Sequence, residues 1–450
     1  MPKKLVLIVI DGLTPSAFER AVVDDTAPAL AFLAKQGRYG QAVSVFPSLT
    51  PVCLSAIATG GGPGVHGIPH LVWYDRDAHR VVEYGSSFGA IMAAGFSRSV
   101  IDTIYSMNQK HLSKNAVTIY ESLEDAGLVA AAINITCYRG RTRYLPKLPG
   151  VTKPAYGPQR FFFYSLFESD RTGAPLAVRN RAAGSVDAYA AAVGRWLVTR
   201  DGFDFLAYYL SDYDFASHTH GPDAAGEALA RVDAAVSALM AAAGGPDEFV
   251  ERYAVILCSD HGQTAVTRAA RLQDSFTRLG GEVLVTASNR AGMVYLLPPC
   301  RAEAGELAQL LDTEPAAEVV LYREGSVAVA RRDGAELRFR PRGDGWETSG
   351  DAAVLDQPNA LERSWSALAN PRAGEVIVSA AAGYEFADLG GGHHAGGGSH
   401  GSLCAGDSLV PMLTVGVEAF PLRITDIAPA VLSHFGVEPP SYARPLAHAA

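Results

Sequence analysis

Short apolar runs alternate with longer stretches of helical periodicity along most of this chain. The apolar runs predict buried strands at 5–10, 41–46, 128–135, 203–211, 253–259 and 408–416. The periodic stretches between them predict helices at 28–37, 116–127, 186–198, 223–243 and 424–435. Strands that alternate with helices in this way are typical of a mostly parallel sheet with helices on both faces. The pattern therefore predicts an α/β fold.

The stretch from about 265 to 390 departs from this alternation. Its apolar runs follow one another closely, with little helical pattern between them, at 282–287, 292–298, 318–324, 326–332, 336–342 and 375–380. We expect this stretch to form a smaller mixed α/β subdomain inserted in the main sheet. The predicted organisation is a core built from residues 1–265 and 391–450, with an inserted subdomain over 266–390.

Composition narrows the classes of function. Hydrophobic residues make up 48% of the 450 residues and charged residues 19%, which supports a sizeable core and excludes a disordered or coiled-coil chain. The 38 basic and 47 acidic side chains give a net charge of −9. A dedicated nucleic-acid binder needs a basic face, so we expect no such partner. A small phosphorylated substrate is compatible with this charge, because bound metal ions can supply positive charge.

The cysteines and apolar runs bear on the compartment. The five cysteines are scattered, and no spacing suggests a disulfide framework or a cysteine zinc site, which favours a reducing compartment. The first apolar run has only six residues, too few for the core of a secretion signal. No stretch approaches the ~18 apolar residues that a membrane helix needs. We therefore expect a cytoplasmic protein with no membrane partner.

Ligand-type side chains follow the apolar runs, where sites form in an open α/β sheet. They are Asp11 after the first run, Asp212, Asp214 and His218 after 203–211, and Asp260 and His261 after 253–259. Each has an ordinary explanation on its own: Asp-Gly after a strand is usually a turn, and Asp214 with His218 could be a surface pair on one helix face. Their convergence on several strand ends indicates a site for a divalent metal ion, which prefers carboxylate and imidazole ligands.

Thr50 lies in the segment FPSLTPVCLSAIATG (46–60), where Pro51 suits the first residue of a helix. We expect Thr50 to be the N-cap of that helix, and on local grounds a capping role explains it fully. The same position suits a nucleophile. A helix N-terminus presents free N–H groups that bind phosphate, and a hydroxyl that touches a metal ion would be deprotonated.

A glycine-rich segment, GGHHAGGGSHG (391–401), contains three histidines. Such a tract either binds a metal ion or forms an ordinary solvated loop. His400 shortly precedes a predicted core strand, so we rank it above His393 and His394 as a metal ligand.

Together these segments resemble the alkaline phosphatase superfamily, and most closely its type I phosphodiesterase/nucleotide pyrophosphatase branch. The resemblance rests on VLIVIDG at 6–12, on FPSLTPVCLSAIATG with PGVHGI after it, on DFASHTHGP at 214–222, on SDHG at 259–262, and on His400-Gly401. These segments cover most of the predicted core but not the inserted subdomain. As a set they are specific, although no single one is.

The resemblance implies an alkaline-phosphatase-like sheet and two divalent metal ions, with zinc as the usual metal. One ion would be held by Asp214, His218 and His400. The other would be held by Asp11, Asp260, His261 and the hydroxyl of Thr50. Thr50 would then attack phosphorus, giving a phospho-threonine intermediate that water hydrolyses.

The chain departs from the family pattern after PGVHGI. The family commonly places an asparagine there to bind a phosphate oxygen, whereas this chain has His70 and Leu71. The candidates for a replacement donor are His70, Asn134, Arg139, Arg141 and Arg143. A solvated basic loop is the more ordinary explanation for any one of the arginines.

Two segments bear on the substrate. Residues 71–74 and 160–167 are rich in apolar and aromatic side chains. They would suit the second substituent of a diester if they line the pocket, although core packing is their ordinary role.

These observations favour a metal-dependent hydrolase of phosphate esters, with phosphodiesters or nucleotide pyrophosphates as substrates. A phosphonoacetate hydrolase and a phosphomonoesterase are alternatives with the same metal site. A phosphoglycerate mutase-like isomerase would use a serine nucleophile and an early inserted domain, and Thr50 and the late insertion count against it. A metal-binding protein without activity would not need to keep all seven candidate ligands.

Overall fold

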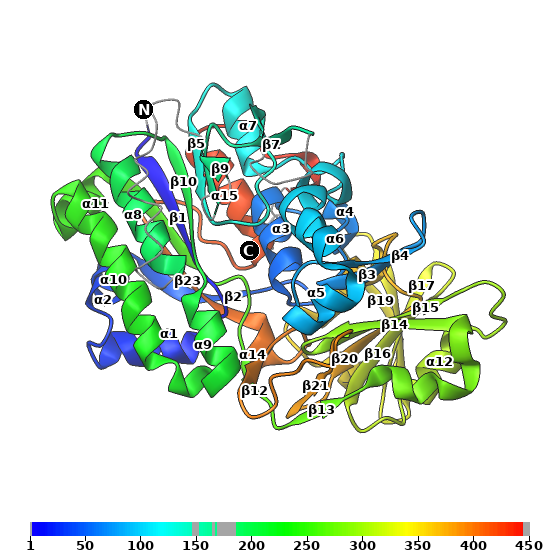
Figure 1. Ribbon diagram of the computed structural model, residues 1–450. Helices are drawn as coiled ribbons and strands as arrows, with labels where there is room; N and C mark the ends of the chain where they lie inside the picture. Colours follow the sequence, from blue (N-terminus) through cyan, green and yellow to red (C-terminus); the bar gives the residue numbers. More distant parts are fainter. Residues whose placement is uncertain (1, 146–152, 164–166, 169–185, 444–450) are drawn as a thin grey trace.

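The computed structural model describes residues 2–145, 153–163, 167–168 and 186–443. Two large sheets lie side by side as two lobes (Figure 1). In spatial order, the first sheet comprises β2 (Arg38–Val43), β23 (Leu409–Val415), β11 (Tyr253–Cys258), β1 (Lys4–Ile10), β10 (Phe205–Leu210), β5 (Ala130–Ile133), β8 (Arg160–Phe163) and β9 (Phe167–Glu168). These strands include all six that the apolar runs predict.

The centre of the first sheet is parallel. β11, β1, β10, β5 and β8 run in one direction, and β2, β23 and β9 add antiparallel pairs toward the edges. In this register Ile8 pairs with both Tyr208 and Leu257. The carboxyl ends of β11, β1 and β10 therefore lie next to one another. The predicted α/β fold with a mostly parallel central sheet is confirmed.

Helices cover both faces of this sheet because β1 is apolar at every position. Val6, Ile8 and Ile10 pack into one buried cluster, and Leu5, Leu7 and Val9 pack into another. The first face is covered by α1 (Pro15–Val23), α2 (Pro28–Gln36), α8 (Val186–Thr199) and α10 (Gly226–Ala243). The second is covered by α3 (Thr50–Thr59), α7 (Ile119–Asp125) and α15 (Ile427–His434).

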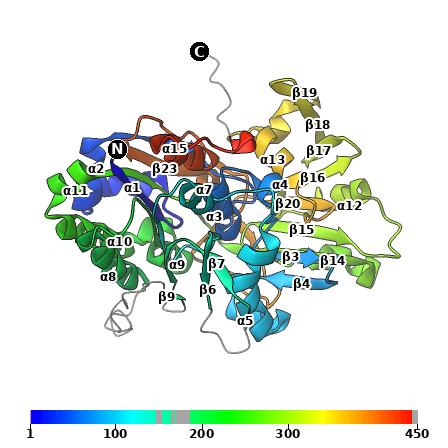
Figure 2. The same ribbon diagram turned by 90° about the horizontal axis from the view of Figure 1, so that it is seen from above.

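The second sheet is antiparallel throughout and built from the predicted insertion. Its strands are β14 (Val283–Ser288), β15 (Ala291–Leu296), β20 (Val376–Ala380), β16 (Ala317–Glu324), β17 (Val327–Arg332), β18 (Ala335–Arg342) and β19 (Gly345–Gly350). Figure 2 shows this lobe beside the first, with α12 (Ala304–Leu311) and α13 (Ala360–Leu368) on it. Two short pairs join the chain as it enters and leaves the lobe, β12 (Thr264–Ala265) with β22 (Gly398–Ser399) and β13 (Arg268–Ala270) with β21 (Tyr384–Phe386).

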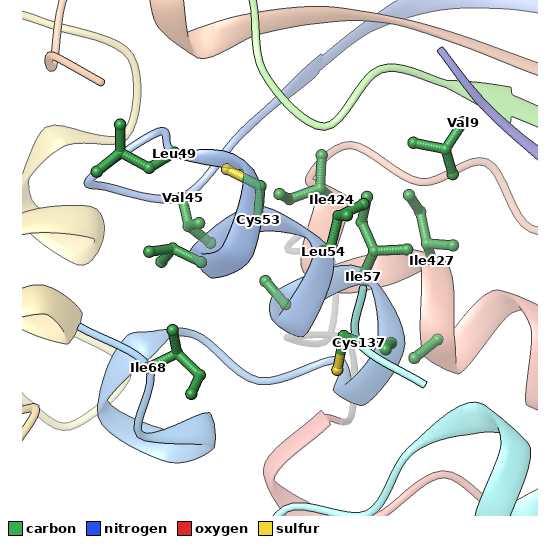
Figure 3. Close-up of a cluster of buried hydrophobic side chains, with 14 of the residues drawn as sticks. Val9, Val45, Leu49, Cys53, Leu54, Ile57, Ile68, Cys137, Ile424 and Ile427 are labelled. Carbon is green, nitrogen blue, oxygen red and sulfur yellow. The ribbon is translucent and has the colours of Figure 1, made fainter. Parts of the chain in front are cut away.

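Helix α3 is buried on every side, because each residue from Pro51 to Thr59 is apolar or small enough to be enclosed. Figure 3 shows Leu54 and Ile57 among the buried side chains of this region, together with Ile424 and Ile427. Helix α3 is therefore held firmly, and its first residue has a fixed place.

Some elements carry no clear signal in the sequence. These are the hairpin of β3 (Val72–Asp75) and β4 (Arg80–Glu83), the helices α5 (Phe88–Ala94) and α6 (Phe96–Ile101), and the π-helix η1 (Asp102–His111). Among the described residues no single helix is both long and apolar enough to cross a membrane. Only α10 together with α11 (Pro246–Arg252), bent by 75°, meets those criteria as a pair.

Candidate active site

All seven predicted metal ligands meet at the carboxyl ends of three neighbouring strands. Asp11 follows β1, and Asp260 and His261 follow β11. Asp214 and His218 lie on α9 (Asp212–His220), which follows β10. The remaining two come from further away, Thr50 from the start of α3 and His400 from the loop before β23. The sheet register thus brings together residues that are up to 389 positions apart.

The Nε2 atom of His261 is the centre of one half of this cluster. It lies 3.1 Å from Thr50 Oγ1, 3.3 Å from Asp11 Oδ1 and 3.5 Å from Asp260 Oδ2. Asp11 Oδ2 accepts a hydrogen bond from Tyr209, so Oδ1 is the oxygen left for the cluster. Four potential ligand atoms therefore face one small buried space.

The structure corrects the expectation that Thr50 is an N-cap. The cap position belongs to Leu49, which makes no side-chain capping hydrogen bond, and Thr50 is the first helical residue. The Thr50 hydroxyl consequently does not satisfy a backbone N–H of its own helix and instead faces His261. Because capping does not explain this hydroxyl, a role in the site is the explanation that its contacts favour.

The other half of the cluster surrounds Asp214. The predicted helix pair is confirmed, with His218 Nε2 3.2 Å from Asp214 Oδ2. His400 Nε2 lies 4.0 Å from Asp214 Oδ1. Ligand atoms of Asp214, His261 and His400 lie within 4.8 Å of one another, as do those of Asp11, Asp260 and His261. His261 therefore belongs to both groups.

The three imidazoles of the cluster are oriented in the same way. Each uses Nδ1 to donate to a backbone carbonyl: His261 to Gly262 at 3.0 Å, His218 to Gly398 at 2.8 Å and His400 to Ser48 at 2.8 Å. This arrangement places a hydrogen on Nδ1 and turns each Nε2 toward the cluster, where it can bind a metal ion when it carries no proton. Metal-binding histidines are commonly fixed by such outer hydrogen bonds.

The carboxylates of the first half crowd one another. Burial raises the pKa of Asp11, and the nearby Asp260 and Asp214 raise it further. Burial also raises the pKa of Asp260. Asp11 Oδ1 and Asp260 Oδ2 are buried and have no hydrogen-bond partner among the described residues. Unpaired buried carboxylate oxygens beside an imidazole are costly unless a cation satisfies them, so these residues fit a divalent metal ion.

Asp214 and His218 behave as an ion pair. Burial alone would raise the pKa of Asp214, but His218 and His400 outweigh it and lower that pKa below the ordinary carboxyl range. Burial would lower the pKa of His218, whereas Asp214 raises it, and the net direction is upward. A metal ion held by His218 Nε2 and Asp214 Oδ2, which both face the cluster, would replace this mutual stabilisation.

The arginines proposed as phosphate donors lie elsewhere. Arg139 pairs with Glu121 at 3.1 Å and donates to backbone carbonyls. Arg141 pairs with Glu121 at 2.9 Å and with Asp125 at 2.9 Å. Both arginines thus brace α7, and no described contact joins them to the cluster. Arg143 is exposed. Their expected contact with the substrate is not supported by these positions.

His70 and Asn134 are both fully buried. His70 accepts a hydrogen bond from the Val72 N–H at Nδ1, and burial lowers its pKa to about 4. Asn134 ends β5 at the sheet edge that carries the cluster, with a φ of +57°. No described contact joins either side chain to Thr50 or to a candidate ligand.

Where the structure describes them, the two aromatic segments pack in the core. Val72 and Trp73 are buried in β3, and Phe161, Phe162 and Phe163 are buried in β8. Core packing, their ordinary role, therefore explains them. Residues 164–166 of the second segment lie outside the described residues.

Two further groups lie beside the cluster: Asn289, which sequence reasoning missed, and His394, which it ranked below His400. Asn289, between β14 and β15, places Nδ2 2.9 Å from His400 Nε2. The ring of His394 stacks on His218 at 4.0 Å, and its Nδ1 lies 3.1 Å from the buried Glu385. An asparagine between two strands is typical of a turn, so the sequence carries no signal that separates Asn289 from an ordinary turn residue.

Comparison with known proteins places the sequence of this chain in a family. The sequence model of the type I phosphodiesterase / nucleotide pyrophosphatase family matches residues 5–403, which include all seven predicted ligands. The chain belongs to this family. As a member of it, the protein is a metal-dependent hydrolase of phosphate esters. No curated protein matches the chain significantly in sequence.

Solved structures support the fold. Phosphonoacetate hydrolase from Sinorhizobium meliloti 1021, in complexes with phosphonoformate and with phosphonoacetate, is 18% identical with a TM-score of 0.62, over 96% of each chain. Murine ectonucleotide pyrophosphatase/phosphodiesterase 5 is 14% identical with a TM-score of 0.64, over 97% of this chain and 96% of that one. Both similarities extend through the second lobe of this type I phosphodiesterase family member, and together they show an alkaline-phosphatase-like fold.

Proposed function

We propose that this enzyme hydrolyses phosphodiesters or nucleotide pyrophosphates with Thr50 as the nucleophile. The observation that carries the proposal is the Thr50 hydroxyl, which is free of any capping role and lies 3.1 Å from His261 Nε2 in a buried carboxylate–imidazole cluster. A hydroxyl is a weak nucleophile at its ordinary pKa and needs activation. The cluster is the group of residues that would provide it.

The donor set supports two divalent ions, and we propose zinc. Asp11, Asp260, His261 and Thr50 would hold one ion, and Asp214, His218 and His400 the other. Imidazole with carboxylate ligands suits zinc. Bound ions at such a site stabilise negative charge on phosphoryl oxygens and lower the pKa of a water molecule.

The remaining steps belong to the chain itself. The backbone N–H of Thr50 stands at the start of α3 and makes none of the described hydrogen bonds, so it can donate to a phosphoryl oxygen there. Thr50 Oγ1 would lose its proton to solvent and attack phosphorus, the P–O bond to the leaving group would break, and the departing oxygen would take up a proton from water. Water then attacks the resulting phospho-threonine intermediate, releasing the product and restoring the hydroxyl. The burial of α3 keeps the attacking atom in place throughout.

Neighbouring structures agree with a small phosphoryl ligand and a threonine. An inactive threonine-to-alanine variant of the murine enzyme is described in complex with AMP. The bacterial hydrolase is described with phosphonoformate and phosphonoacetate. A phosphonate-cleaving activity is therefore the second candidate, because the bacterial hydrolase is similar to this chain over its whole length.

A substrate panel tests the proposal. The test is the ratio of kcat/KM for bis-nitrophenyl phosphate to kcat/KM for nitrophenyl phosphate. We expect this ratio to be well above one, and we expect little phosphate to be released from phosphonoacetate. A ratio well below one would make the protein a monoesterase. Faster phosphate release from phosphonoacetate than from either ester would favour the second candidate.

A further inference from the structure

Asn289 is a buried polar residue that the second lobe places against the cluster. It lies in the turn between β14 and β15, in the left-handed backbone region with a φ of +55°. Its carbonyl accepts a hydrogen bond from the Phe386 N–H at 2.6 Å, and the next residue, Arg290, donates its N–H to the carbonyl of His400 at 2.8 Å. The turn is thus bonded on one side to the second lobe and on the other to the loop that carries His400.

The amide of Asn289 has a defined orientation. Its Oδ1 accepts a hydrogen bond from Ser288 Oγ at 3.0 Å, so its NH₂ group points the other way, toward His400 Nε2 at 2.9 Å. His400 donates through Nδ1 to Ser48, so its Nε2 is the acceptor of this contact. The NH₂ group of Asn289 therefore opens onto the same space as the lone pair of a candidate metal ligand.

Metal binding changes the balance for this amide. If His400 held a metal ion through its Nε2 lone pair, the NH₂ group of Asn289 would lose this acceptor. A buried donor without an acceptor is unfavourable. A phosphoryl oxygen of the substrate, bound at the same ion, is an acceptor that would satisfy it.

We propose that Asn289 positions the substrate by donating a hydrogen bond to a phosphoryl oxygen. This inference rests on the proposed function. A neutral donor suits this place, since Asp11, Asp214 and Asp260 already give the cluster several carboxylates. It would add a side-chain donor to the backbone N–H of Thr50, since Arg139 and Arg141 are engaged on α7.

The experiment has to distinguish a phosphoryl donor from a metal ligand at Asn289. If the amide were turned over, Oδ1 would face the cluster and could bind the metal ion directly. An aspartate would then be an equal or better ligand. A phosphoryl donor, in contrast, cannot be replaced by aspartate, because a carboxylate accepts hydrogen bonds and repels the phosphate charge.

The test compares Asn289→Gly and Asn289→Asp with the wild-type protein, all loaded with zinc. Glycine tolerates the φ of +55°, so Asn289→Gly removes the amide without straining the turn. Asn359→Gly is the matched control, because Asn359 also has a positive φ, of +47°, and is exposed at the start of α13 with no side-chain capping bond. The measurements are zinc content, the affinity for inorganic phosphate by calorimetry, and kcat/KM for bis-nitrophenyl phosphate.

We expect Asn289→Gly to keep its zinc, to bind phosphate about tenfold more weakly and to lose about tenfold or more in kcat/KM. Asn289→Asp should keep its zinc and bind phosphate more weakly still, and Asn359→Gly should match the wild type. Unchanged phosphate affinity in Asn289→Gly would overturn the inference. So would zinc loss in Asn289→Gly together with full activity in Asn289→Asp, since that result identifies a metal ligand.

The wild-type protein separates this inference from the proposed function. If it binds phosphate but hydrolyses none of the esters, the proposed function fails while the role of Asn289 in phosphate binding is still decided by the variants. If the zinc-loaded protein binds no phosphate at all, the inference about Asn289 fails whatever the protein hydrolyses.

Discussion

The imidazole rings of His261 and His400 stack with their centroids 3.6 Å apart and their planes 9° from parallel. His261 follows β11 at the centre of the sheet, whereas His400 comes from the loop that returns from the second lobe. In the proposed assignment the two residues bind different ions. Their direct contact joins the two halves of the cluster into one continuous site. The half that contains His400 is complete only when the return loop is correctly seated.

Removal of one ligand should affect its own half most. We expect His218→Ala to lose about one metal ion per chain and to keep the ion held by Asp11, Asp260 and His261. His220→Ala is the matched control, because His220 lies on the same helix, is exposed and should leave the metal content unchanged. Elemental analysis after gel filtration measures both variants. Equal loss of both ions in His218→Ala would contradict the assignment.

Metal uptake should release protons. The pKa of Asp11 and of Asp260 is raised in the metal-free protein, chiefly by burial, so these carboxyls hold protons to a higher pH than ordinary ones. A metal ion has to displace those protons, and its apparent affinity should therefore rise with pH through and above the ordinary carboxyl range. Calorimetric titration with zinc in buffers of different ionisation enthalpy measures the protons released. A zinc affinity that stays constant or falls with rising pH would contradict the raised pKa values of Asp11 and Asp260.

The same shifts predict how the metal-free protein responds to pH. A carboxyl whose pKa is raised on folding contributes stability below its unfolded pKa, and that contribution is lost as the pH rises through the folded value. Asp11 and Asp260 should therefore contribute least to the stability of the metal-free protein at neutral pH. Bound zinc should stabilise the protein most at that pH. Thermal melts with and without zinc at several pH values measure this difference, which should widen as the pH rises.

The ion pair between Arg290 and Asp407 should matter for stability. Both side chains are fully buried, their atoms lie 2.9 Å apart, and Arg290 reaches from the second lobe to the segment before β23. Arg290→Met leaves the Asp407 charge buried without its cation, and we expect a loss of about 3–5 kcal/mol in the free energy of unfolding. Arg340→Met is the control, because its pair with Glu347 is about half exposed and should contribute about 0–1 kcal/mol. Denaturant unfolding measures both, and similar losses in the two variants would contradict this account.

Much of the site could be predicted from the sequence because its ligands follow strong local patterns. Asp11 and the Asp260-His261 pair each come directly after a run of buried strand residues, and a parallel sheet brings the carboxyl ends of its strands together. The i,i+4 spacing of Asp214 and His218 likewise fixes their contact on one helix. Such features need no knowledge of distant residues.

The sequence does not reveal contacts between side chains that are distant along the chain. Arg139 and Arg141 pair with Glu121 and Asp125, which lie 16 to 20 residues earlier. No periodic pattern in the sequence predicts that pairing. Asn289 has the composition of an ordinary turn, and its contact with His400 depends on how the second lobe seats against the first. The boundaries of the inserted subdomain and the cytoplasmic location stay predictions.

Substitutions at Thr50 should separate catalysis from folding. We expect Thr50→Ala to lower kcat by several orders of magnitude and Thr50→Ser to keep part of it, since the hydroxyl remains. Thr50 provides no capping bond, so the fold should survive both changes. Thr59→Ala is the control at the other end of α3: it removes a hydrogen bond to the Ser55 carbonyl, costs about 1 kcal/mol in stability and should leave kcat unchanged.

The covalent intermediate tests the central claim most directly. The zinc-loaded enzyme is mixed with excess bis-nitrophenyl phosphate, quenched in acid during the first turnover, digested and mapped by mass spectrometry. The account predicts a nitrophenyl-phosphoryl adduct on Thr50, formed together with a burst of one nitrophenol per site and absent from Thr50→Ala. Turnover of the ester with no adduct on Thr50, and with Thr50→Ala as active as the wild type, would contradict it.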